Sequence, residues 1–110
     1  MILIKKPIKL KNFLDSLTTN QKLLKTVIDI DNRILLTDLD LHIDGEDYLY
    51  DIGSKNSDIW GCYIDVEDNE LIFMAMTNFK PWVNNLNEEI QDEVIKDKMR
   101  MIVTDLIVGF

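Results

Sequence analysis

The chain has 110 residues, of which 46% are apolar, with one cysteine, one histidine and a formal net charge of −8. This length fits a single domain spanning residues 1–110, which buries enough surface to fold without a disulfide or a metal. The apolar content excludes a disordered chain, and a lone cysteine, Cys62, excludes an internal disulfide. The start MILIKKPIKLK differs from a secretory signal in order and length, and no run of about 18 apolar residues follows. We therefore expect a cytoplasmic protein that makes no membrane contact.

Charge is unevenly distributed along the chain. Residues 1–25 contain six lysines and one acid, whereas residues 26–75 contain thirteen acids and two bases. Phosphate backbones repel an acidic surface, so we expect no direct nucleic-acid binding. The same charge attracts a basic protein and accelerates the encounter with it.

The N-terminal quarter predicts a short helix followed by a strand. Leu10, Phe13, Leu14 and Leu17 have the spacing of one helical face, and Pro7 suits the approach to that helix. Residues 23–30, LLKTVIDI, are compatible with a helical turn or a strand, and their β-branched content favours the strand. A turn is expected at residues 31–32, Asp-Asn.

Two hairpins are predicted in the middle of the chain. In the first, residues 34–43 form a strand, Asp44-Gly45 forms a type I′ turn, and residues 46–52 return. A polar loop, GSKNSD, covers residues 53–58. The second hairpin comprises residues 59–67, a tight turn at residues 68–69, and a return over residues 70–77, before Pro81. Its first strand places Trp60, Cys62, Ile64 and Val66 on one side.

The C-terminal segment predicts a long helix. Asn85 and Glu88 have the spacing of a capping box, and acids precede bases along the segment as the helix dipole favours. A broad apolar stripe is formed by Leu86, Ile90, Val94, Ile95, Ile102, Val103 and Leu106. The fold class is therefore α+β: an antiparallel β-meander of about four strands packed in two layers against an N-terminal helix and a long C-terminal helix.

The stretch TDLDLHIDGED, residues 37–47, carries an acid or the histidine at alternate positions. With a turn at Asp44-Gly45, its polar side chains share the outer face of the first hairpin with those of the return strand. The second hairpin adds further acids and a tyrosine. The predicted partner-binding residues are Asp38, Asp40, His42, Asp47, Asp51, Asp65, Glu67, Asp68 and Tyr63.

Three interpretations of this acidic face remain open. Asp40-x-His42-x-Asp44-Gly45 overlaps the EF-hand pattern, and Asp38, Asp40, His42 and Asp51 form an alternative transition-metal set. Their alternation also fits the solvated face of an antiparallel sheet, or a face covered by the N-terminal lysines. The third interpretation is a binding surface for a basic partner.

An apolar patch is expected beside the acids. Tyr63, Ile72, Met74 and Met76 share the outer side of the second hairpin. An apolar patch rimmed by acids is typical of a binding site, or of a surface for self-association. The alternative is that a helix of the same chain covers the patch.

The sequence contains no catalytic signature: no glycine-rich phosphate loop, no C-x-x-C motif and no serine or cysteine placed beside the histidine. We therefore expect no enzyme and no cofactor. The favoured hypothesis is a small acidic inhibitor of the immunity or antitoxin kind, which covers the groove of a basic, nucleic-acid-acting toxin. In bulk character the chain is similar to small acidic bacterial immunity proteins and to phage-encoded inhibitors. The alternatives are a phage inhibitor of a nucleic-acid-binding defence enzyme and a divalent-metal-binding protein.

Overall fold

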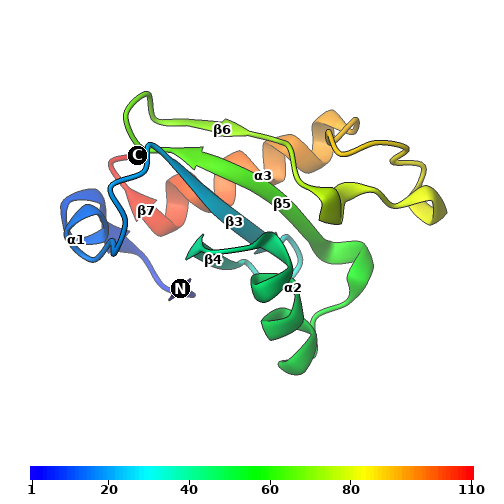
Figure 1. The fold of residues 1–110 in the computed structure, drawn as a ribbon, viewed down its shortest axis with the longest axis horizontal. Helices are drawn as coiled ribbons and strands as arrows, with labels where there is room; N and C mark the ends of the chain where they lie inside the picture. The colour runs from blue at the N-terminus through cyan, green and yellow to red at the C-terminus, as the bar shows by residue number, and fades with distance from the viewer.

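A five-stranded antiparallel sheet forms the centre of the computed structural model, which describes all residues 1–110 (Figure 1). The sheet contains β1 (Ile2–Ile4), β3 (Leu23–Asp29), β4 (Ile34–Leu39), β5 (Ile59–Asp65) and β6 (Glu70–Ile72) in the order β1-β4-β3-β5-β6. Two short strands, β2 (Ile8–Lys9) and β7 (Ile107–Val108), pair in parallel apart from it. The longest pairing joins β3 and β5 over seven residues each and connects the strand that precedes the first predicted hairpin to the first strand of the second.

The first face of the sheet carries the main core. α1 (Leu10–Asp15) and α3 (Glu93–Leu106) contribute Phe13, Met99 and Ile102 to it, all essentially inaccessible to solvent. From the sheet, β5 contributes Trp60, Cys62 and Ile64, as the alternating pattern predicts. The α+β class with helices packed on an antiparallel sheet is thus confirmed. A bilayer-spanning helix must be long and apolar, and none of these helices qualifies.

The second face is covered in part by α2 (His42–Asp51), which stands in place of the return strand of the first predicted hairpin (Figure 1). The prediction of a strand to Ile43, a turn at Asp44-Gly45 and a return strand is wrong, because β4 ends at Leu39. Alternating acids and apolar residues imitate a strand, but Leu41 and Ile43, which a strand would bury, are exposed. The buried residues of α2 are Gly45, Glu46 and Leu49, at helical spacing.

Asp38, the residue before the last one of β4, has a left-handed φ of 54° and lies where the pairing of β3 with β4 shifts register. Its carboxylate Oδ2 accepts hydrogen bonds from the backbone N–H of Thr18 at 3.0 Å and from the Thr18 hydroxyl at 2.8 Å. Aspartate tolerates this backbone region better than most residues because its short side chain can bond locally. The strand therefore bulges at Asp38, Leu39 still pairs with Lys25, and the chain then leaves the sheet and begins α2 at His42.

The C-terminal helix begins later than the capping-box pattern predicts. α3 begins at Glu93, after Asp92, whose side chain accepts a hydrogen bond from the Val94 N–H at 2.8 Å. Asn85 is buried instead in the preceding loop, where its amide donates to the carbonyls of Asn78, Asn87 and Glu89. These carbonyls fulfil the hydrogen-bonding capacity of the Asn85 amide, so the loop before α3 is held in place although it is not helical.

Two further sequence expectations change in the structure. The strand expected over residues 70–77 ends at Ile72, and a short 3₁₀ helix, η2 (Met76–Asn78), follows. The order of the strands in the sheet also differs from that of a simple meander, because β5 pairs with β3 and not with β4. α2 provides the connection that carries the chain from β4 across to β5.

Replacement of Gly45 tests the packing of α2. A Cβ at this position would lie 2.5 Å from Val27 Cγ2 and 2.7 Å from Leu39 Cδ1, which is too close for real atoms. In an exposed helix Gly→Ala stabilises by up to about 1 kcal/mol. Here we expect Gly45→Ala to destabilise by about 1–3 kcal/mol in urea unfolding, because the added methyl overpacks the interface. Asp47→Ala, on the exposed side of the same helix, is the control and should be close to neutral.

Candidate functional site

Two hollows adjoin α2, and β3 contributes Leu23 and Lys25 to both. The first hollow is an apolar groove of about 860 Å³. It runs from the N-terminal turn of α2 across β5 and β6 to η2 and to η3 (Pro81–Val83). Its apolar lining consists of Leu23, Leu41, Ile43, Tyr63, Ile72, Met74, Ala75, Met76, Phe79 and Trp82. This volume is within the range of ligand-binding pockets in proteins.

Several of the large side chains in the groove are exposed to solvent. Met76 is 78% exposed, Trp82 65% and Phe79 52%. Tyr63, Ile72, Met74 and Met76 do share one surface, because all four line the groove and Tyr63 pairs with Ile72. Met74 and Met76 lie beyond β6, so the predicted hairpin side itself is limited to Tyr63 and Ile72. The alternative of a covering helix is wrong, since α2 flanks the groove and leaves these residues open. An exposed patch of this kind is typical of an interaction surface.

His42 forms part of the groove wall, half-buried at the start of α2. Its Nε2 lies 2.8 Å from the Cys62 carbonyl oxygen, and its ring meets the Tyr63 ring edge-on with centroids 5.0 Å apart. Burial lowers the pKa of His42, and Lys25 lowers it further against the opposing effect of the carbonyl. The neutral imidazole therefore donates its Nε2 proton to the carbonyl and adds no positive charge to the groove.

Gly61 lets Ala75 and Thr77, which line the groove, pack close to β5 beside His42. A Cβ there would lie 2.5 Å from Ala75 Cβ, 2.7 Å from Thr77 Oγ1 and 3.4 Å from His42 Cδ2. The Asn78 side chain holds this glycine, accepting from its N–H at 2.7 Å and donating to its carbonyl at 2.9 Å. The nearby Thr77 hydroxyl is the one buried side-chain polar atom without a hydrogen-bond partner in the protein.

The opposite end of the groove contains a hydrogen-bonded chain of polar side chains. Trp82 Nε1 donates to Asn56 Oδ1 at 2.9 Å, the Asn56 amide donates to the Tyr50 hydroxyl, and that hydroxyl donates to Glu46 Oε1 at 2.9 Å. Beneath it, the fully buried Lys80 donates from Nζ to the Asn56 carbonyl at 2.6 Å and lies 5.3 Å from the Trp60 ring. Burial lowers the pKa of Lys80, while Glu46 and Asp58 act to raise it. None of these polar residues was predicted, because they come from separate segments.

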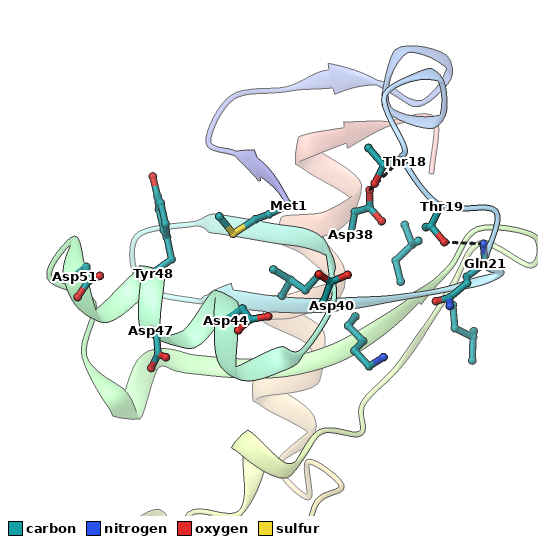
Figure 2. A pocket seen from close by; sticks show the side chains of 14 residues that line it. Met1, Thr18, Thr19, Gln21, Asp38, Asp40, Asp44, Asp47, Tyr48 and Asp51 are labelled. Carbon is teal, nitrogen blue, oxygen red and sulfur yellow. Dashed lines mark hydrogen bonds between the residues drawn. The ribbon is translucent and has the colours of Figure 1, made fainter.

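The second hollow is acidic and has a volume of about 740 Å³ (Figure 2). Figure 2 shows Asp44, Asp47 and Asp51 along α2, with Asp38 and Asp40 at the end of β4. Four of the predicted binding residues, Asp38, Asp40, Asp47 and Asp51, are thus brought together, although by a helix and not by a hairpin face. Asp40 and the three helix aspartates are exposed, whereas Asp38 is half-buried by its bonds to Thr18.

The remaining predicted acids lie elsewhere. Asp65 closes the turn between β5 and β6 by accepting from the N–H groups of Glu67 and Asp68, both at 3.0 Å. Lys22 Nζ lies 3.4 Å from Asp65, 3.9 Å from Glu67 and 3.0 Å from Asp68. Burial acts to raise the pKa of Asp65, but these N–H groups and Lys22 lower it overall. The predicted acidic residues therefore do not form one face, and Lys22 offsets part of the negative charge at this turn.

The metal hypothesis has no support in the geometry. No group of three or more His, Cys, Asp or Glu side chains lies close enough together to hold a metal ion. In particular, His42 faces the Cys62 carbonyl in the groove, whereas Asp38, Asp40 and Asp51 line the other hollow. The hypothetical set Asp38, Asp40, His42 and Asp51 is therefore divided between two sites.

A Cys–His nucleophilic pair is not formed either. Cys62 is completely buried among apolar side chains, and this burial raises the pKa of its thiol far above the ordinary value. His42 contacts the Cys62 carbonyl and not its sulfur. A protonated, enclosed thiol is a packing residue and not a nucleophile.

A family model for proteins described as "Protein of unknown function (DUF5674)" matches residues 2–106. The chain belongs to this family. The match spans both hollows and all three α-helices, so the architecture described here is that of the DUF5674 region itself. No curated protein and no solved structure matches the chain significantly.

The low pKa of His42 predicts a pH-dependent stability of this DUF5674 chain. The unfolded histidine titrates near 6.5, whereas the folded one titrates lower. As the pH falls through this window, the unfolded state binds a proton that the folded state does not, so stability must fall. The pKa values of Asp29 and Asp65 are lowered below 3.8, so the stability that these two carboxylates contribute is lost only at more acidic pH.

We therefore expect the melting temperature, followed by circular dichroism, to fall between pH 7 and pH 5. In His42→Gln this fall should be absent, since glutamine retains a donor for the Cys62 carbonyl but does not titrate. An equal fall in the variant would show that a group other than His42 is responsible.

Proposed function

We propose that this protein is a non-catalytic inhibitor of the immunity type, which binds a basic, nucleic-acid-acting protein through α2 and the hollows beside it. The single observation that carries the proposal is the open apolar groove next to the five-aspartate hollow. Protein-binding sites commonly combine an apolar centre with a polar or charged rim. We place its action in the cytoplasm, where the reduced thiol of Cys62 is stable.

The apolar groove supports binding to a protein surface. Exposed methionines, Met74 and Met76, lie beside two exposed aromatics, Phe79 and Trp82. Methionine side chains adapt to partners of varied shape, and tryptophan is enriched among the residues that contribute most to binding. Burial of these side chains by a partner removes apolar surface from water and stabilises the complex.

The acidic hollow supports a basic partner. Five aspartates surround it and Lys25 is its one basic side chain, within a chain of net charge −8. Grooves that bind phosphate backbones are basic, so the exposed aspartates along α2 are complementary to such a groove in charge. A partner that binds α2 with its basic groove would be blocked from nucleic acid while contacting the apolar groove with adjacent residues.

The test begins with the tagged protein expressed in its own host. We expect it to retain one basic protein in the wild-type form, and to lose it in Asp44→Lys and in Met74→Glu. With both proteins purified, wild-type protein should inhibit the nucleic-acid-directed activity of the partner. Each variant should weaken binding by about tenfold or more, because each places a charge against the proposed contact. Asp44→Lys, which replaces an acidic side chain by a basic one, should also reduce the salt dependence of the association rate.

Asp97→Lys is the matched control. Asp97 lies on α3, on the other face of the sheet, where it forms only an exposed pair with Arg100. This variant should bind and inhibit as the wild type does. Equal loss in the control, or a bound partner whose activity is unaffected, would contradict the inhibitor proposal. A dimer in light scattering that Met74→Glu converts to a monomer would assign the groove to self-association instead.

A further inference from the structure

The most unusual charged group in the groove is Glu46. It is only 9% exposed, yet it lines the groove from the middle of α2. A carboxylate has about four acceptor positions, and the only partner of this one is the Tyr50 hydroxyl on Oε1. No cation contacts this largely buried carboxylate directly, so its environment favours the arrival of a cation that does.

The cations of the protein itself do not neutralise Glu46 by contact. No lysine, arginine or histidine forms an ion pair with it, although such pairs occur elsewhere in the chain. Lys80 is close enough to influence it, but its ammonium donates to the Asn56 carbonyl at 2.6 Å. His42, one helical turn before Glu46, is engaged with the Cys62 carbonyl.

The surroundings of Glu46 fix a binding geometry. The hydrogen-bonded chain through Tyr50 and Asn56 connects Glu46 Oε1 to the Trp82 indole, so the carboxylate and the ring are held in a defined relation. Trp82 is 65% exposed and also lines the groove. A tryptophan ring attracts cations over its face, and an anchored carboxylate offers them a charge-assisted hydrogen bond.

We propose that Glu46 and Trp82 form a seat for a lysine or arginine side chain that a partner protein inserts along the apolar groove. The inference rests on the proposed function and specifies the chemistry of the partner at this site. A basic side chain fits because its aliphatic stem packs on apolar surface while its charged end reaches the carboxylate. The methionines and aromatics of the groove provide that surface, and Glu46 provides the end point.

The first experiment uses octylammonium, octanol and octanoate as probes of equal chain length. Binding is followed through the methyl NMR signals of Met74 and Met76. We expect octylammonium to bind about tenfold or more tightly than octanol, and octanoate to bind most weakly, because only the ammonium meets the carboxylate. In Glu46→Gln, which keeps the shape and the bond to Tyr50, this preference should disappear while octanol affinity remains.

Glu88→Gln is the matched control, because Glu88 also lines the groove but is exposed. It should retain the preference for octylammonium. If wild-type protein binds octanol and octylammonium equally, the cation seat is wrong and the groove of the proposed function stands. If it binds neither, the groove takes no apolar ligand and the proposed function loses its main support.

A second experiment identifies the source of the cation. An amphipathic leucine–lysine peptide is compared with a counterpart in which the central lysine is norleucine. We expect the lysine peptide to bind more tightly to wild-type protein, with the difference abolished in Glu46→Gln. A preference for octylammonium without a preference for the lysine peptide would assign the seat to small amines and overturn the partner side-chain proposal.

Discussion

Helix α2 lies close against the sheet because Gly45 has no side chain. Methyl groups of Val27 and Leu39 lie only 2.5 Å and 2.7 Å from where a Cβ would stand, so the helix backbone approaches β3 and β4 directly. Leu49 then reaches the small core on this face, with Leu36 and Ile59. Close packing of this kind fixes both the position and the rotation of a helix, and every feature of the two hollows depends on it.

This placement of α2 divides the side chains of one short segment between the apolar groove and the acidic hollow. Successive residues of a helix point in different directions, so His42 and Glu46 line the apolar groove while Asp44, Asp47 and Asp51 line the acidic hollow. A strand would have placed the same residues on only two opposite sides. The result is a surface on which an apolar groove and an acidic hollow lie next to each other, a combination that is common in protein-binding sites.

Several buried polar residues maintain the groove without lining its apolar part. Asn78 bonds both backbone groups of Gly61, and Asn85 bonds the loop before α3. Lys80 and Asn56 support the end of the groove that contains Trp82. Buried polar networks that are satisfied in this way specify a single arrangement of the loops, because an alternative arrangement leaves charged or amide groups unpaired. The groove is therefore a preformed feature of the fold.

The sequence by itself determined the α+β class, the alternation that buries Trp60, Cys62 and Ile64, and the shared side of Tyr63 and Ile72. Those properties follow from local periodicity, which a strand next to a core must obey. The tertiary structure decided that residues 42–51 form a helix, because the alternation there was outweighed by packing of Gly45 and Leu49 on β3 and β4. It also decided the pairing of Lys22 with Asp65 and the meeting of Glu46, Asn56 and Trp82. These contacts join segments far apart in the chain, and no local pattern records a contact between distant segments.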